Sequence, residues 1–178
     1  HAEKGFSVIY HSGRDKVKMM SLPEIGLKTS DTDDCFKLIS STPVTSVVDD
    51  YEMLTGKRRH CHNEANECTY RFENVKGLRV DLIFRVYNDG IAFRYHLPKT
   101  KEEIVVLDEY TAFAFTPGIK RWTQKFTVGY EDFYWPNTDG VADNEEREWS
   151  FPTLFQPSDS AFVLLTEANI LRDNTGAY

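Results

Sequence analysis

The chain of 178 residues has a mass of 20.6 kDa, which suits one domain with a substantial buried core. Hydrophobic residues make up 40% and charged residues 28%, a composition typical of globular proteins and not of disordered or fibrous ones. The net charge of −7 disfavours non-specific binding to nucleic acid. The apolar runs are shorter than the roughly 20 residues that cross a bilayer, so we expect no transmembrane segment.

Apolar and polar residues alternate with a period of two in many short segments, which is typical of β-strands with one buried face. In chain order this pattern predicts strands at residues 6–10, 16–20, 35–41, 68–73, 78–86, 91–97, 104–107, 111–115 and 161–166. No segment of a dozen residues has helical periodicity. The nearest candidate, residues 50–60, is interrupted by Thr55-Gly56 and predicts a single turn at most.

The segments 78–86 and 91–97 flank Asn88-Asp89-Gly90. Two alternating segments around Asp-Gly are a strong signal for a β-hairpin, because glycine accepts the positive φ that such a turn requires. The sequence therefore predicts a hairpin here.

Together these features predict an all-β protein, most simply an antiparallel β-sandwich of two packed sheets. The last predicted strand falls within residues 161–170, and no closing element follows it. We therefore expect residues 1–178 to form one incomplete domain, truncated at its C-terminal end.

Residues 122–151 differ from the rest of the chain. They contain all three tryptophans, five further aromatic residues and the acidic run 143–146, and they predict a long excursion rather than plain sheet. The rings either cover one end of the sandwich or a partner domain, or stack on sugar. Packing is the favoured interpretation.

Three cysteines do not make a disulfide framework. Cys61 lies between His60 and His62, which suggests metal binding. However, residues one apart on a strand face opposite sides, and no second Cys or His pair has zinc-finger spacing. A structural or surface role is therefore favoured over zinc.

Five motifs follow one another along the chain, and they are His60-Cys61-His62-Asn63-Glu64, Phe84-Arg85-Val86-Tyr87-Asn88-Asp89-Gly90-Ile91-Ala92-Phe93-Arg94-Tyr95, Asp108-Glu109-Tyr110-Thr111, Tyr130-Glu131 and Leu164-Leu165-Thr166-Glu167-Ala168. In this order they resemble the N-terminal domain of glycoside hydrolase family 97. The resemblance covers nearly the whole chain, and its most specific part is residues 84–95.

The resemblance implies a sandwich of the galactose mutarotase-like type, placed before a catalytic (β/α)8 barrel of the same polypeptide. Members of the family are calcium-dependent α-glucosidases or α-galactosidases, typically exported to the periplasm or cell envelope of polysaccharide-degrading bacteria. The general acid and the base or nucleophile lie on the barrel, which this chain lacks. We therefore expect no catalytic residue here and no activity of the chain alone on oligosaccharides or glycosides.

One site residue is implied by the resemblance. The Glu of Leu164-Leu165-Thr166-Glu167-Ala168 is similar to the calcium ligand that the sandwich contributes to the active site. Calcium prefers hard oxygen ligands, and a carboxylate at a strand end is positioned by a rigid scaffold. Glu167 is thus expected to bind calcium in the intact enzyme only.

Two other hypotheses remain open. The chain could be an independent carbohydrate-binding module that uses the aromatic residues of segment 122–151. It could also be a small mutarotase-type enzyme, which needs a histidine and a carboxylate facing each other in a cleft. For that enzyme His60, His62 and His96 are the only plausible bases.

Overall fold

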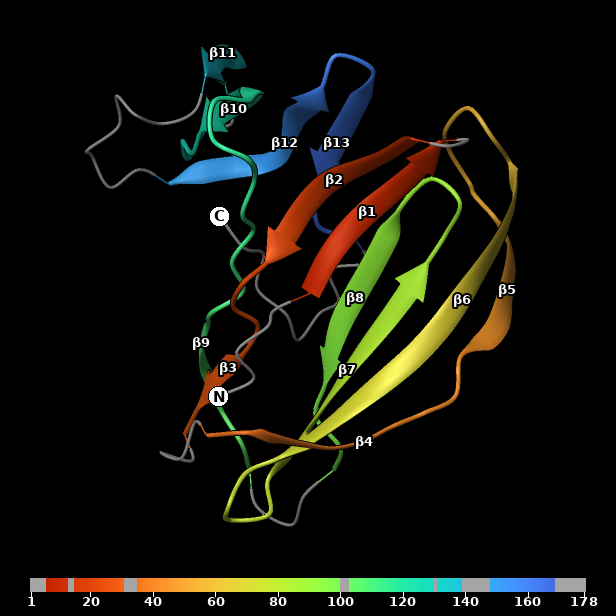
Figure 1. Cartoon of the computed structure of the whole chain (residues 1–178), viewed down its shortest axis with the longest axis vertical. Coiled ribbons are helices and arrows are strands. Elements are labelled where there is room, and N and C mark those ends of the chain that lie inside the picture. The colour runs from red at the N-terminus through yellow and green to blue at the C-terminus, as the bar shows by residue number, and fades with distance from the viewer. Residues whose placement is uncertain are drawn as a thin grey trace. The chain divides into compact units, whose positions relative to one another are not determined.

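The computed structural model describes residues 6–12, 15–30, 35–99, 103–129, 131–138 and 148–168. These residues form β-strands and connecting segments and no helix (Figure 1), so none of them belongs to a helix long and apolar enough to cross a membrane. The chain divides into two compact units. Unit 1 comprises residues 1–25 and 111–178, and unit 2 comprises residues 26–110.

Unit 2 contains a five-stranded antiparallel sheet and a two-stranded one. The larger sheet has the order β4-β6-β7-β8, and β5 also pairs with β6. Its strands are β4 (Lys37–Ser41), β5 (Thr45–Glu52), β6 (His60–Glu73), β7 (Arg79–Val86) and β8 (Ile91–His96). The smaller sheet pairs β3 (Leu27–Thr29) with β9 (Val106–Glu109).

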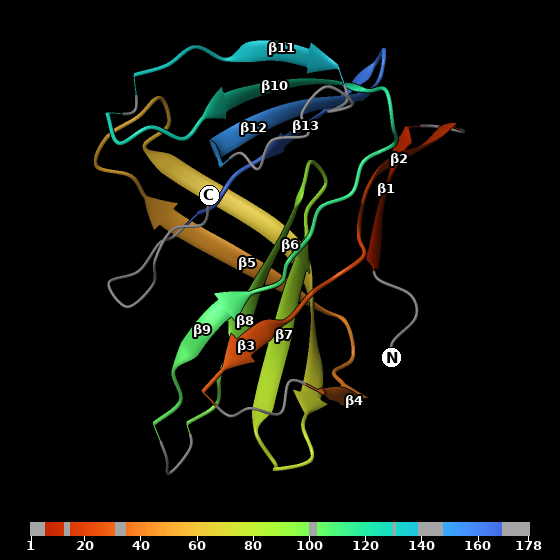
Figure 2. The ribbon, with the colours of Figure 1, turned by 90° about the vertical axis from the view of Figure 1, so that its left-hand side faces the viewer.

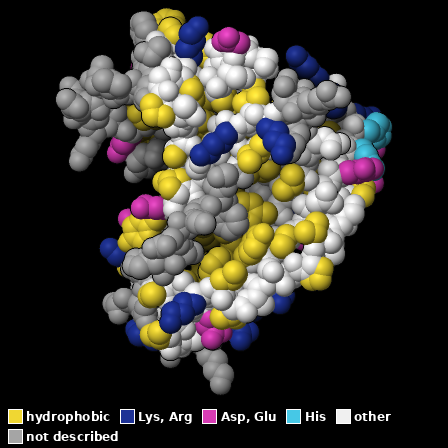
Figure 3. Space-filling model, in the orientation of Figure 1, with side chains coloured by type: hydrophobic (Ala, Val, Ile, Leu, Met, Phe, Trp, Pro, Cys, Tyr) yellow, Lys and Arg dark blue, Asp and Glu magenta, His cyan; other side chains and the backbone are white. Residues whose placement is uncertain are grey.

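One face of the five-stranded sheet is apolar because the period-two pattern aligns across strands. Val80, Leu82 and Phe84 of β7 are buried, and Leu82 is only 1% exposed. Phe84 contacts Tyr70 and Phe93 with ring centroids 6.0 and 5.6 Å apart. Figure 3 shows hydrophobic side chains gathered where β7 and β8 lie in the view of Figure 1.

The opposite face of this sheet is polar, and ion pairs connect its strands. Arg85 of β7 donates from Nε to Glu67 of β6 at 2.7 Å and from Nη1 to Asp49 of β5 at 2.6 Å. These carboxylates, Glu67 first, raise the pKa of Arg85. One guanidinium therefore connects three neighbouring strands, with its planar fork shared between two acids.

Two connections of unit 2, between β6 and β7 and between β7 and β8, are short turns. Between β6 and β7, the Oδ1 of buried Asn74 accepts hydrogen bonds from the backbone N–H groups of Lys76 and Leu78, and Gly77 has a φ of 84°. The predicted hairpin of β7 and β8 is confirmed, with the Tyr87 N–H bonded to the Gly90 carbonyl at 2.8 Å. The expected role of Gly90 in this turn is wrong, because Gly90 is not among the described glycines with a positive φ.

Unit 1 contains a four-stranded sheet and a hairpin. The sheet has the order β11-β10-β12-β13, and Figure 2 shows these strands side by side. They are β10 (Lys120–Lys125), β11 (Trp135–Thr138), β12 (Trp149–Ser158) and β13 (Ala161–Leu165). The hairpin pairs β1 (Phe6–Ser12) with β2 (Asp15–Leu22), and β2 contacts β12 and β13. Met20, Leu22 and Ala161 are buried here.

The predicted strands are recovered apart from one. Residues 111–115 form no strand, and only a single bridge joins Ala114 to Ser21. The excursion expected at residues 122–151 is also wrong in part, because β10, β11 and the start of β12 lie there. The acidic run 143–146 and Tyr130 lie outside the described residues. The segment 50–60 is strand at both ends with a turn between them, and has no helix.

Candidate functional site

Unit 1 has an open cavity of about 390 Å³ on one face of its sheet. Strands β10, β12 and β13 supply one wall, and residues 113–119 supply the other. Its lining is mostly aromatic and aliphatic, with three threonines and one arginine: Phe113, Phe115, Thr116, Ile119, Arg121, Thr123, Trp149, Phe151, Thr153, Phe155 and Leu165. Its volume falls within the range of small-molecule sites, although the cavity is open to solvent.

Strand pairing explains why these residues share a face. Arg121 lies opposite Phe155, and Thr153 lies opposite Leu165. Alternating side chains of a strand point to opposite faces, so the odd-numbered residues of β12 line the cavity together. Phe155 stacks on Phe115 at 3.8 Å between ring centroids, so the two walls of the cavity are in contact here.

Polar groups within the cavity are few and fixed in position. The guanidinium carbon of Arg121 lies 5.6 Å from the centroid of the Trp149 ring, which is cation–π geometry. Thr153 donates its hydroxyl to the Ser150 carbonyl at 3.1 Å. Thr123 is only 2% exposed, and its Oγ1 has no hydrogen-bond partner among the described residues. A buried hydroxyl of this kind is costly unless something bonds to it.

Glu167 is close in sequence to the same wall. It is exposed and lies two residues after Leu165, the last residue of β13. Two residues of extended chain span about 7 Å, so the Glu167 backbone is near the cavity lining. The described residues contain no group of three or more His, Cys, Asp or Glu that could hold a metal ion. A carboxylate such as that of Glu167 has the chemistry of a calcium ligand, and calcium takes six to eight oxygen ligands in all.

The aromatic residues of segment 122–151 do not act as one cluster. Trp149 and Phe151 line the cavity. Trp122 instead contacts Phe162, with ring centroids 6.2 Å apart. The side chain of Trp135 lies outside the described part of the chain.

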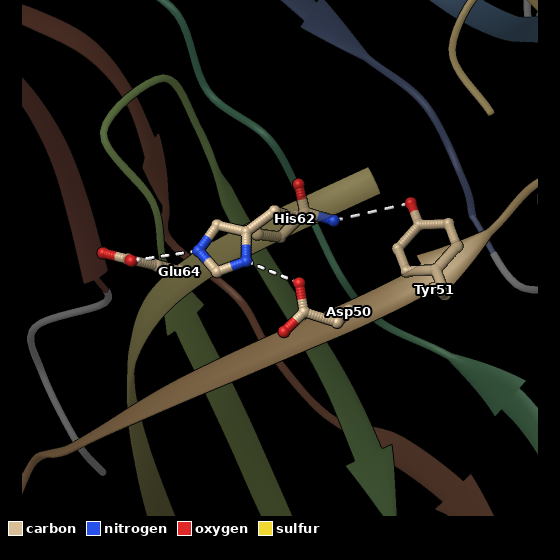
Figure 4. Close-up of polar contacts among 5 residues, drawn as sticks. Asp50, Tyr51, His62 and Glu64 are labelled. Atoms are coloured by element: carbon tan, nitrogen blue, oxygen red, sulfur yellow. Dashed lines mark hydrogen bonds and ion pairs between the residues drawn. The ribbon is translucent and has the colours of Figure 1, made fainter. Parts of the chain in front are cut away.

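The three candidate histidine bases all lie on the five-stranded sheet of unit 2, and none of them lines the cavity of unit 1. His60 pairs with Glu52 at 3.2 Å, and His96 pairs with Asp81 at 3.3 Å. His62 lies between Asp50 and Glu64 on an exposed surface (Figure 4). A general base in a cleft is not what this arrangement provides, so the mutarotase-type hypothesis gains no support.

The carboxylates beside His62 change its acid–base behaviour. Its Nδ1 is 2.5 Å from Asp50 Oδ1, and its Nε2 is 3.0 Å from Glu64 Oε1. These hydrogen bonds, with Glu64 the larger influence, raise the pKa of His62 above 6.5.

The three cysteines are free thiols. Cys61 and the flanking histidines form no metal site in the part of the chain that is described. Cys68 donates its Sγ–H to the Thr42 carbonyl at 3.3 Å, which is a structural contact.

Sequence reasoning missed Arg121 and Thr123. Both lie on β10. No alternation of apolar and polar residues predicts this strand, because its buried residues, Thr123 and Gln124, are polar. On β12 the odd-numbered residues Thr153 and Phe155 share a face, but prolines within the segment interrupt the pattern of a strand.

Comparison with known proteins gives a consistent result. A family model described as "Glycosyl-hydrolase 97 N-terminal" matches residues 2–178. A "probable retaining alpha-galactosidase" of Streptomyces bingchenggensis (strain BCW-1) is 29% identical over 124 residues, which cover 70% of this chain and 19% of that protein.

Solved structures of a glycoside hydrolase family 97 enzyme from Pseudoalteromonas sp. strain K8 share the fold. Its complex with acarbose matches with a TM-score of 0.64 and 20% identity over 93% of this chain and 27% of that one. A single-residue variant matches with a TM-score of 0.64 and 19% identity, over 87% of this chain and 24% of that one. The chain thus spans about a quarter of these enzymes.

These matches confirm the all-β antiparallel fold, and the N-terminal domain of these enzymes is a sandwich. Because the family match extends over almost the entire sequence, the chain belongs to the glycosyl hydrolase 97 N-terminal family.

Proposed function

We propose that this chain is the non-catalytic sandwich part of a calcium-dependent α-glycosidase. In this proposal it packs against a catalytic barrel of the same polypeptide and contributes Glu167 to the active-site calcium. The substrate is an oligosaccharide or glycoside with an α-glucosidic or α-galactosidic bond. Family membership and the α-galactosidase relative support the glycosidase part of the proposal.

The observation that carries the metal role is the position of Glu167. Glu167 is exposed just after the end of β13, an edge strand that is held in the sheet by its pairing with β12. A carboxylate on a rigid strand end can be presented to a partner surface without loss of order in the sheet. A single carboxylate supplies at most two of the six to eight oxygens that calcium takes, so barrel residues and water must supply the others.

The full-length enzyme tests this role with Glu167→Gln, which keeps the shape and removes the charge. We expect calcium affinity, measured by isothermal titration calorimetry, to fall together with kcat on an aryl α-glycoside. Glu148→Gln is the matched control, since Glu148 is also an exposed carboxylate of unit 1. Parent-like calcium affinity and turnover in Glu167→Gln would show that the residue is an ordinary strand-end glutamate.

The isolated chain tests the assignment of catalysis to the barrel. We expect no release of sugar from aryl α-glucosides or α-galactosides, because the acid and second carboxylate of glycoside hydrolysis are expected on the barrel. Its melting temperature should not shift with added CaCl₂ or EDTA, since one carboxylate makes no stable calcium site. Calcium-dependent hydrolysis by the purified chain would contradict the proposal.

An independent carbohydrate-binding module is the second candidate function, and the cavity of unit 1 is the observation that favours it. The aromatic rings that line it can cover the C–H faces of a sugar. Titration of the isolated chain with maltooligosaccharides or galactosides separates the two. Saturable quenching of tryptophan fluorescence that is lost in Phe151→Ala would favour the binding module.

We also propose that the intact protein is exported to the periplasm or cell envelope, as the family resemblance implies. Fractionation of the source cells, with detection by an antibody to this chain, tests the proposal. Recovery in the cytosolic fraction alone would contradict it.

A further inference from the structure

The far end of the β5–β6 ladder is a two-stranded arm. Strand β6 pairs with β7 only from Asn66 onward and with β4 only from Tyr70 onward. Before Asn66 its only partner among the described strands is β5, through the register from Ala65↔Val47 to His60↔Glu52. Residues 47–52 and 60–65 are named the β5–β6 arm, which Figures 1 and 2 show beyond the broad part of the sheet. A two-stranded ribbon is marginally stable in water, so cross-strand side-chain pairs decide its order.

One face of the arm concentrates ionisable groups. His62 lies opposite Asp50 in the register, and His60 lies opposite Glu52. Glu64 is two residues beyond His62 and so shares its face. His62 has Asp50 at its Nδ1 and Glu64 at its Nε2, as Figure 4 shows, while His60 Nδ1 is 3.2 Å from Glu52.

The opposite face of the arm carries a different set of contacts. Asp49 pairs with Arg85, and the Asn63 side-chain amide donates to the Tyr51 hydroxyl at 3.4 Å. Among the residues that the structure describes, the charged and titratable groups on the His62 face of the arm are Asp50, Glu52, His60 and Glu64, all from β5 and β6.

The geometry at His62, with a carboxylate oxygen near each ring nitrogen, favours a ring that carries two protons. A neutral imidazole has one N–H, and its other nitrogen carries a lone pair. With a carboxylate oxygen at each nitrogen, the neutral ring would direct that lone pair at a negative group. Only the imidazolium donates to Asp50 and Glu64 at once and offsets part of their charge.

We propose that the β5–β6 arm is a proton-dependent clamp: protonated His62 holds β5 to β6 through Asp50 and Glu64, and neutral His62 lets the arm open. This inference does not depend on the proposed glycosidase function. The contacts also raise the pKa of His62 above 6.5, Glu64 more than Asp50. A raised pKa in the folded state means that the stabilisation is fully present below pH 6.5 and is lost as pH rises through the folded pKa.

The effect is local and moderate because these side chains are more than half exposed to solvent. Exposed ion pairs change a local equilibrium by about two- to fivefold. We therefore expect the arm's amides to lose about two- to fivefold in protection when His62 is deprotonated, with little change in the melting temperature of the whole protein.

The test uses the full-length protein and hydrogen–deuterium exchange by mass spectrometry from pH 5.5 to 9, corrected for the intrinsic pH dependence of exchange. Peptides that cover residues 47–52 and 60–65 should lose protection as pH rises. Exchange of the His62 ring C–H in the same digests gives its pKa, which we expect above 6.5 and lowered in the Asp50→Asn, Glu64→Gln double variant.

Two variants separate a proton effect from simple loss of structure. His62→Gln cannot be charged, so its arm should be weakly protected at every pH. Asp81→Asn is the control, since it removes the carboxylate of a histidine pair outside the arm, at His96, and should leave the arm's pH response unchanged. A wild-type arm whose protection does not change with pH, or whose response persists in His62→Gln, would overturn the proposal.

Discussion

The sheet of unit 2 and the sheet of unit 1 are stabilised in different ways. In unit 2, β7 pairs residue for residue with β6 and β8 without a register shift, and one apolar face runs across all three strands. In unit 1, register shifts occur between Trp122 and Gln124 and between Phe155 and Ser158. Its most buried positions include four polar residues, and its aromatic face leaves a cavity. Regular pairing produces a closed apolar layer, and bulged pairing leaves room for a site.

The largest expected effect is a loss of stability when a core leucine is truncated in either unit. Leu82→Ala in β7 and Leu22→Ala in β2 each remove a side chain that is at most 1% exposed, and each should cost about 2–5 kcal/mol. All three tryptophans fall in unit 1, so urea unfolding followed by tryptophan fluorescence reports on that unit. We expect Leu22→Ala to shift the fluorescence transition more than Leu82→Ala does.

Leu164→Ala is the control for these core variants because Leu164 is 61% exposed. Its cost should stay below about 1 kcal/mol. Equal fluorescence shifts for Leu82→Ala and Leu22→Ala would mean that the two units unfold as one, and the comparison would then not hold for stability.

The next effect concerns charge across the regular sheet. Arg85→Lys keeps the charge but loses the fork that bonds Glu67 and Asp49, and should cost about 1–2 kcal/mol. Arg79→Lys, which affects an exposed pair with Glu73, should produce no measurable change in the urea midpoint. Similar costs for the two variants would show that Arg85 is not a link between strands.

The same contrast explains which parts of the fold the sequence could predict. The alternation of Val80, Leu82 and Phe84 around an Asp-Gly turn specified β7 and β8, because burial of one face is what the period-two pattern encodes. Strand β10 was not predicted, because its buried positions Thr123 and Gln124 read as polar. Residues 111–115 alternate like a strand, yet only Ala114 forms a bridge. Tertiary contacts, and not the local pattern, determine the conformation of that segment.

The candidate site divides in the same way. The position of Glu167 at a strand end followed from the alternating run before it, and the structure has β13 ending at Leu165. The cavity was not predictable, because it depends on Arg121, Phe155 and Leu165 meeting across three strands. The pattern within a single segment does not show which strands will become neighbours. The calcium role of Glu167 remains a prediction.

Two glycines sharpen the description of the turns in unit 2. Gly77 has a φ of 84°, and a Cβ there would meet no atom within 4 Å. Gly77→Ala should therefore cost about 1 kcal/mol through backbone strain alone. Gly90 has equally open surroundings but no positive φ, so Gly90→Ala should be neutral or stabilise by up to about 1 kcal/mol. Urea denaturation of the two variants by circular dichroism checks this, and equal destabilisation would restore the turn mechanism expected from the sequence.

The smallest effect compares two threonines of the cavity wall in unit 1. Both are almost fully buried, at 2% for Thr123 and 5% for Thr153. The Thr153 hydroxyl donates to the Ser150 carbonyl at 3.1 Å, whereas the Thr123 hydroxyl has no hydrogen-bond partner among the described residues. Valine has nearly the shape of threonine but lacks the hydroxyl. Thr153→Val should therefore destabilise unit 1 by about 1 kcal/mol, since it removes a satisfied hydrogen bond.

Thr123→Val should instead be neutral or stabilise unit 1 by up to about 1 kcal/mol, because it removes a buried hydroxyl that lost its water without gaining a partner. Urea unfolding followed by tryptophan fluorescence measures both variants in the same unit. A cost for Thr123→Val equal to that of Thr153→Val would mean that a bound water or another part of the protein satisfies the Thr123 hydroxyl in solution. The same measurement in the full-length enzyme then separates these two cases, because a partner from the rest of the polypeptide makes Thr123→Val costly only there.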